Sequence, residues 1–202
     1  MKLKSIKLKQ YVATAALLCT GLMASTAMAS EEHYQFDIKG QHAFIQFKVK
    51  HLGYSWLYGE FRKFNGNFTF DAANAKHNSI HVTIDAMSID TNHAERNKHL
   101  RSPDFFAAKK FPVITYNSTS YEDKGNGHGI MHGMLTMRGV SKAVDLDVNQ
   151  IGTGKDPWGG YRRGFEAHTT LHLSDYNMPF APKLGPVSDS VELNISIEGI
   201  RE

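Results

Sequence analysis

The chain has 202 residues, of which 41% are hydrophobic, and its 23 Lys and Arg stand against 20 Asp and Glu. Its one cysteine, Cys19, excludes an internal disulfide and a metal site built from several thiolates. The net charge of +3 gives no indication of nucleic-acid binding, because four lysines in the first nine residues account for the excess.

The first 29 residues have the pattern of a secretory signal peptide. Lysines precede the apolar run YVATAALLCTGLMA, and Ala-Met-Ala occupies positions 27–29. The run is short and rich in small residues, unlike a membrane-spanning helix. We expect cleavage after Ala29, export to the periplasm, and a mature domain of residues 30–202 without a transmembrane segment. That domain has 19 basic and 20 acidic residues, so we expect no nucleic-acid partner.

Alternating apolar and polar residues predict β-strands from Tyr34 onward. Turn signals such as DKGNGHG (123–129) separate them, which is typical of an antiparallel sheet. About eight such strands most simply close into a barrel, which either is filled by its own side chains or holds one small ligand. The composition does not choose between these. The expected strands cover 43–51, 67–71, 79–90, 111–122, 129–137, 143–151, 165–173 and 190–200.

One segment, TNHAERNKHLRSPDFFAAKKFP (91–112), breaks the strand pattern. Thr91 or Asn92 is a suitable N-cap for a short helix that runs to about Leu100. The sequence Ser102-Pro103-Asp104 resembles the start of a second short helix, which would end before Pro112. The expected fold is therefore an all-β, antiparallel eight-stranded barrel with one or two short helices.

Four separated motifs occur in the mature domain: FKVKHLGYSWLYGEF (47–61), IDTNHAERNKHLRSPDFF (89–106), GMLTMRGVSK (133–142) and DPWGGYRRGFEA (156–167). With these motifs the chain resembles the YceI family of bacterial periplasmic proteins over residues 34–200. The resemblance implies a lipocalin-like barrel with a long apolar pocket. It also implies binding of polyisoprenoid chains, such as isoprenoid quinones or polyprenyl phosphates, or of related long-chain amphiphiles, and no established reaction. Asn97 stands where members often have Asp.

Apolar side chains on the inward parity of the strands are the candidates for holding a lipid tail. Phe105 and Phe106 would cover one barrel end. These side chains either fill the barrel or line a tunnel, where burial contributes roughly 0.8 kcal/mol per CH₂ without a specific hydrogen bond. The predicted lining residues are Ile45, Phe47, Val49, Phe61, Phe68, Phe70, Phe105, Phe106, Tyr116, Leu135, Met137 and Phe165.

His51 ends the apolar row of the segment 43–51, so we expect it to point inward. It would either hydrogen-bond a neighbouring strand or helix, or contact the polar head of a ligand. His99 and Arg101 are the candidates for a second polar contact. The fixed donors of Arg101 suit a phosphate or a quinone carbonyl, but an ion pair with Glu95 or Asp104 at the surface is the alternative.

The sequence offers little support for metal or catalytic chemistry. His168 and His172 are four apart, which on a strand separates them by ~13 Å, too far to share an ion. No Gly-x-Ser-x-Gly motif occurs, and we assign no catalytic residue, metal or covalent cofactor.

The predicted function is a carrier of an isoprenoid lipid, with a quinone among the candidate ligands. Two alternatives stay open: a redox accessory that holds a quinone beside a membrane cytochrome, and an enzyme that acts on a lipid. A homodimer also stays open.

Overall fold

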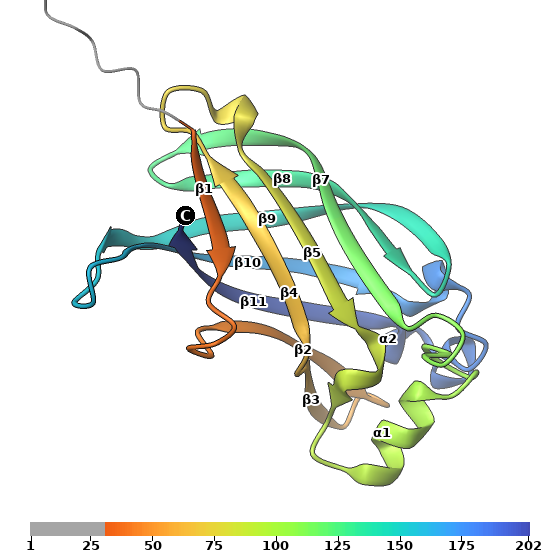
Figure 1. Cartoon of the computed structure of the whole chain (residues 1–202). Coiled ribbons are helices and arrows are strands. Elements are labelled where there is room, and N and C mark those ends of the chain that lie inside the picture. The colour runs from red at the N-terminus through yellow and green to blue at the C-terminus, as the bar shows by residue number, and fades with distance from the viewer. Residues whose placement is uncertain (1–30) are drawn as a thin grey trace, which may run out of the picture.

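The computed structural model describes residues 31–202, and the expected signal peptide lies outside them. Most of this region is strand (Figure 1). No helix among these residues is long and apolar enough to cross a bilayer. The strands are β1 (Glu32–Phe36), β2 (Ala43–His51), β3 (Ser55–Phe61), β4 (Phe64–Phe70), β5 (Ser79–Asp85), β6 (Ile89–Asp90), β7 (Val113–Gly125), β8 (His128–Met137), β9 (Val140–Lys155), β10 (Tyr161–His172) and β11 (Ser190–Arg201).

Eight strands close into an antiparallel barrel, as the sequence predicts. Their order is β1-β4-β5-β7-β8-β9-β10-β11, and pairing of β1 with β11 closes the ring. The three other strands, β2, β3 and β6, occupy the positions of β1, β4 and β5 farther along the barrel, each separated from its counterpart by a short break. The edge of β11 that pairs with β1 at residues 199–201 pairs with β2 at residues 191–197. In the same way β3 pairs with β2, and β6 pairs with β3.

The alternation along each strand separates the barrel interior from its surface. In β2, Ala43, Ile45 and Phe47 are buried, whereas Phe44 and Gln46 are exposed. A glycine occurs where an aromatic ring lies across a neighbouring strand. A Cβ atom on Gly133 would lie 2.4 Å from the ring of Tyr116, so only glycine leaves room for that ring.

One end of the barrel is closed by a buried arginine. Arg163 donates hydrogen bonds to Glu32 (3.0 Å) and Gln150 (2.7 Å), and its guanidinium lies 3.6 Å from the centroid of the Phe70 ring. Phe165 packs edge-on against Phe68 just inside this layer, with ring centroids 5.4 Å apart. This end of the interior is therefore occupied by aromatic and paired charged side chains.

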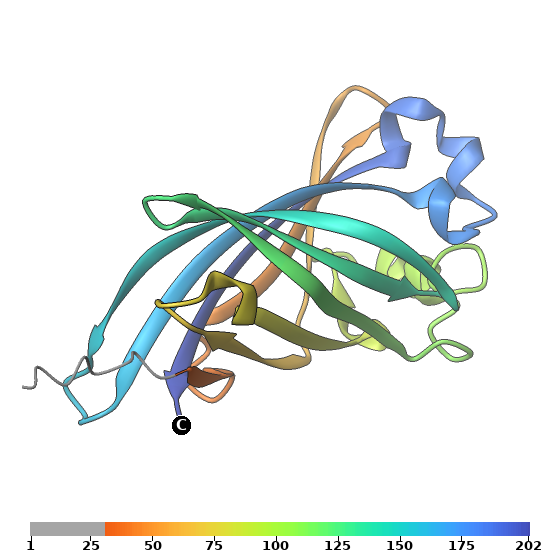
Figure 2. The ribbon, with the colours of Figure 1, turned by 90° about the horizontal axis from the view of Figure 1, so that it is seen from above.

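The opposite end is covered by two irregular segments (Figures 1 and 2). Helix α1 (Ala94–Arg101) follows β6, with His93 as its N-cap. Between β10 and β11 lies a connection of three short helical turns. The short helices are η1 (Ala75–His77), η2 (Ala86–Ser88), η3 (Leu173–Tyr176), η4 (Ala181–Leu184) and α2 (Pro186–Asp189).

The expected second helix after Ser102 is wrong, because residues 102–111 form successive turns. The four consecutive residues from Phe105 to Ala108 are all buried, whereas a regular surface helix buries one stripe only. Ala107 also has a φ of +47°, which ends helical geometry. Arg138 joins both covering segments, since it donates to the carbonyl oxygens of Pro103 (2.8 Å) and Asn177.

Candidate functional site: an apolar lumen with a basic rim

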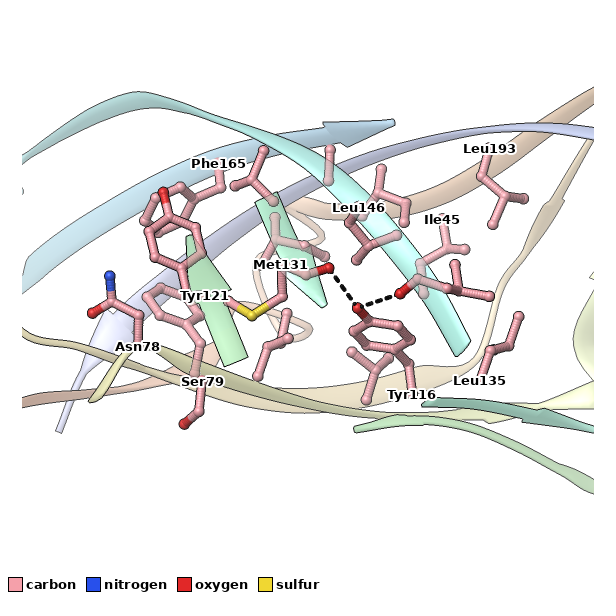
Figure 3. A pocket seen from close by; sticks show the side chains of 18 of the residues that line it. Ile45, Asn78, Ser79, Tyr116, Tyr121, Met131, Leu135, Leu146, Phe165 and Leu193 are labelled. Carbon is pink, nitrogen blue, oxygen red and sulfur yellow. Dashed lines mark hydrogen bonds between the residues drawn. The ribbon is translucent and has the colours of Figure 1, made fainter. Parts of the chain in front are cut away.

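The barrel interior contains an apolar cavity of about 120 Å³, here called the inner chamber (Figure 3). It lies in the middle of the barrel and extends toward the end closed by Arg163. Its walls come from β4, β5, β7, β8, β9, β10 and β11 and from one residue of β2. The lining residues are Ile45, Phe68, Thr69, Phe70, Asn78, Ser79, Ile80, Val82, Ile84, Tyr116, Tyr121, Met131, Leu135, Val144, Leu146, Val148, Phe165, Ala167, Leu193, Ile195 and Ile197.

A second cavity of about 290 Å³, the outer chamber, lies under α1 and the connection between β10 and β11. Its body is also apolar, and its polar groups gather at the rim. The lining residues are Ile45, Phe47, Val49, Lys50, His51, Leu52, Leu57, Phe61, Ile84, Ile89, Arg96, His99, Leu100, Phe105, Phe106, Ile114, Leu135, Met137, Leu171, Leu173, Phe180, Leu184, Ser188, Val191 and Leu193.

The two chambers adjoin, because four residues line both of them: Ile45, Ile84, Leu135 and Leu193. Along β11 the inward side chains run from Val191 in the outer chamber to Ile197 in the inner one. Six residues of strand correspond to about 20 Å of lumen. Leu193 and Ile195 point inward and yet are only partly buried, so neighbouring side chains leave this space unfilled.

The inner chamber holds no charged group. The hydroxyl of Tyr116 makes a shared hydrogen bond to the carbonyl oxygens of Met131 (2.9 Å) and Val144 (3.1 Å), which Figure 3 shows. Burial raises the pKa of Tyr116, and Asp145 raises it further, so the phenol stays neutral. The amide oxygen of Asn78, at one end of the chamber, accepts from the N–H of Asp71 (2.8 Å). The Tyr116 hydroxyl and the Asn78 amide oxygen are therefore already satisfied by the protein.

The rim of the outer chamber is basic. Its polar lining consists of Lys50, His51, Arg96, His99 and Ser188, with no carboxylate. The ring of His99 sits edge-on between the rings of Phe105 (5.1 Å) and Phe180 (5.0 Å) and also contacts Asp104 (2.9 Å). His51 is exposed. The rim can therefore offer hydrogen-bond donors and positive charge to a ligand that enters the lumen tail first.

Fourteen of the fifteen residues assigned to the ligand site line one of the two chambers. Arg101 is the exception, because it lines neither chamber. Its Nη2 donates to the carbonyl oxygen of Ile89 (2.8 Å), and the side chain borders an outer surface hollow with Arg62 and Asp90. The expected partners Glu95 and Asp104 do not pair with it either. On α1 it is Arg96, three residues before His99, that faces the chamber.

Parts of the chamber wall come from segments that the sequence does not predict to lie there. Leu57 belongs to β3, a strand that the sequence did not predict, and Phe180 and Leu184 belong to the connection before β11. The sequence before β11 contains a signal for this contact: a phenylalanine and a leucine lie among prolines, and such a segment is irregular but can make apolar contacts.

Asn97 does not reach the lumen. It is buried, its amide oxygen accepts from the N–H (2.8 Å) and the hydroxyl (2.7 Å) of Thr91, and its Nδ2 donates to Asp90 (2.8 Å). Arg96 adds two hydrogen bonds to Thr91. These bonds fix α1 to the end of β6, so Asn97 positions the helix rather than a ligand.

Two groups of metal-type ligands lie outside the lumen: Glu31, Asp71 and His77, and Asp37, His42 and Glu198. In the second group Arg162 donates to both carboxylates, so a guanidinium already supplies the positive charge. Burial alone would raise the pKa of Asp37, but hydrogen bonds from Arg162, His42 and the N–H of Gly40 outweigh it and lower the pKa to about 2. This group stabilises the barrel end near β1.

The fold and the sequence both have known relatives. A protein of Ectopseudomonas mendocina, described as a UPF0312 protein, is 50% identical over 188 residues, which are 93% of this chain and 96% of that protein. The crystal structure of the Campylobacter jejuni YCEI protein is similar at a TM-score of 0.69 and 35% identity, covering 77% of this chain and 91% of that one.

A polyisoprenoid binding domain from Saccharophagus degradans shares the fold at a TM-score of 0.61, with 16% identity over 84% of this chain and 98% of that one. The model of the YceI-like domain matches residues 34–199. The chain therefore belongs to the YceI-like family.

Proposed function

We propose that this protein binds an isoprenoid lipid and carries it through the periplasm. The tail occupies the inner and outer chambers, and an anionic head, such as a phosphate, lies at the basic rim. The observation that carries the proposal is the unfilled apolar lumen whose cationic lining groups all lie at one end.

The lumen suits a long, narrow, apolar ligand. Its body offers apolar walls for about 20 Å along β11, and the Tyr116 hydroxyl in these walls is already paired within the protein. Each CH₂ that moves from water into such a space contributes roughly 0.8 kcal/mol, so a tail of several isoprene units binds without specific hydrogen bonds. The Saccharophagus protein with this fold is described as polyisoprenoid binding, which supports the same class of ligand.

The rim favours an anionic head over a neutral one. Lys50 and Arg96 are the cationic lining residues, and the lining itself contains no carboxylate, although Asp104 contacts His99 (2.9 Å). A phosphate would accept hydrogen bonds from these groups and gain from their charge. A quinone would gain only the hydrogen bonds.

Native mass spectrometry tests the proposal. The delipidated protein is incubated with geranylgeranyl phosphate, whose tail is about as long as the lumen, with the neutral polyprenol of equal length, and with an isoprenoid quinone. We expect one geranylgeranyl phosphate per protein, bound more tightly than the polyprenol. Lys50→Gln should lower the affinity for the phosphate about fivefold and leave the polyprenol unchanged.

Three results would contradict the proposal. Absence of any long-chain adduct would mean that the lumen carries no lipid. Equal binding of phosphate and polyprenol would remove the role given to the rim. Preferential binding of the quinone would favour the redox accessory beside a membrane cytochrome.

A further inference from the structure

An exposed aromatic and basic surface covers the hairpin between β2 and β3, beside the rim of the outer chamber. We call residues 48–58 the hairpin surface. Within it Leu52, Tyr54, Trp56 and Tyr58 are exposed by 51%, 87%, 41% and 65%. Large apolar side chains on a soluble domain are usually scattered singly, so four within seven residues indicate an interaction site.

The strand register mixes lysines with these rings. Leu57 lines the outer chamber, which places Trp56 and Tyr58 on the outer face of β3. Lys50 pairs with Trp56, and Lys48 pairs with Tyr58. The Nζ atoms of Lys48 and Lys50 lie 4.5 and 5.3 Å from the centroid of the Trp56 ring. The apolar stems of both lysines can therefore lie over aromatic surface while the ammonium groups stay hydrated.

We propose that the hairpin surface docks the protein on the head-group layer of an anionic phospholipid bilayer. Tryptophan and tyrosine favour the membrane–water interface, and lysines beside them are attracted by anionic lipids. Residues 48–58 contain two lysines, one histidine and no acidic residue. Lys48 pairs with Glu192 (2.9 Å), whereas Lys50 has no ion-pair partner among residues 31–202. The charge of the surface thus complements lipid phosphate.

The hairpin surface is continuous with the mouth of the lumen. Lys50, His51, Leu52 and Leu57 belong to both the hairpin surface and the outer chamber. Docking therefore sets the chamber against the bilayer, where an apolar tail can enter without crossing bulk water. Helix α2 packs beside the hairpin, since the Ser188 hydroxyl donates to the Lys50 carbonyl oxygen (2.7 Å). A second copy of the chain fits less well, because two-fold packing of this surface on itself would oppose lysine to lysine.

The two tryptophans of the chain provide an internal control. Trp56 lies in the hairpin surface, and Trp158 lies in the turn between β9 and β10, at the other end of β11, where Arg162 pairs with Ile200. Figure 2 shows this turn and the β2–β3 hairpin at opposite ends of the barrel. Trp158 is also exposed, by 78%. With Trp158→Phe, we expect the remaining fluorescence to shift to the blue on vesicles that contain phosphatidylglycerol. With Trp56→Phe, we expect no shift.

Co-sedimentation with the same vesicles measures the strength of docking. The double variant Tyr54→Ser/Trp56→Ala should lower the partition coefficient at least tenfold. The matched double variant Lys155→Ala/Trp158→Ala, at the other barrel end, should leave it unchanged. Lys48→Ala should lower it about fivefold, and so should phosphatidylcholine vesicles without an anionic lipid.

Three results would overturn the docking proposal: no blue shift from Trp56, equal partition of the two double variants, or binding that does not depend on phosphatidylglycerol. A dimer in solution that Tyr54→Ser/Trp56→Ala abolishes would assign the surface to a second copy and overturn it too. Tyr54 and Trp56 do not line either chamber. Lipid binding in detergent-free solution should therefore persist in that variant, which separates a failure of docking from a failure of the proposed lipid binding.

Discussion

A tryptophan at the junction of the two chambers should divide ligands by tail length. Leu193 lines both chambers and lies two residues along β11 from Val191, so about 13 Å of the lumen extends beyond it to Ile197. In Leu193→Trp a tail that stops at the junction loses this length. Exclusion of only four CH₂ groups would cost about 3 kcal/mol, on the order of 100-fold in Kd.

The assay compares geranyl phosphate with geranylgeranyl phosphate by titration or native mass spectrometry. The variant should bind the long lipid on the order of 100-fold more weakly and the short one nearly as the wild type does. Unfolding should occur at an unchanged or higher temperature, because the new side chain enters unfilled space and does not overpack a filled core. Ser196→Trp, on the outer face of the same strand, is the control. A folded Leu193→Trp protein that retains full affinity for the long lipid would refute a tail path through both chambers.

Three further variants test the scaffold. The folded pKa of Asp37, about 2, lies below its unfolded value of 3.8, so Asp37 contributes about 2 kcal/mol of stability above the unfolded pKa, and this contribution is lost as the pH falls from about 5 to 2. Asp37→Asn should flatten this fall in stability in urea titrations at a series of pH values. An unchanged slope would contradict the assignment of the low pKa to Asp37. Asn97→Asp would oppose a carboxylate to Asp90 and should lower the free energy of unfolding by about 1–3 kcal/mol in urea, while addition of Asp90→Asn should recover part of the loss. Arg163→Met should lower the unfolding free energy by about 2 kcal/mol, because it leaves the carboxylate of Glu32 half-buried with one cationic partner fewer; calorimetry that shows no change would mean the pair is dispensable.

Strand alternation predicted seven of the eight strands of the closed barrel; it missed β1 and, beside the barrel, β3, whose outward side chains explain the miss. In SWLYGEF the outward positions hold Trp56 and Tyr58, and the inward position 59 is a glycine. A Cβ atom at Gly59 would lie 2.2 Å from the ring of Phe47, so this position must stay small. The usual alternation is thus inverted in β3, because its outward positions carry large aromatic residues where polar residues are expected, and one of its inward positions is a glycine.

The predicted residues that lie on strands all line a chamber, whereas on α1 the sequence does not show which side chains face it. Side chains of a strand alternate between two faces, so the inward parity follows once any one residue is placed. On a helix each residue turns by about 100°, and the packing of α1 against β6 decides which cation faces the lumen. Arg96 and His99 face it, and Arg101 turns outward to the carbonyl oxygen of Ile89. The sequence contains no signal for that rotation.

The presence of a lumen depends on where the large side chains lie. Phe70 and Phe165 occupy the end closed by Arg163, and Phe105 and Phe106 lie under α1. Aliphatic side chains line most of the middle, and an eight-stranded barrel is just wide enough that wall residues need not meet across it. Tyr116, the large ring at this level, lies over Gly133 and is tied to the wall by its hydroxyl. A bulkier residue at position 133 would therefore displace that ring into the tail path and reduce the affinity for long tails before it unfolds the barrel.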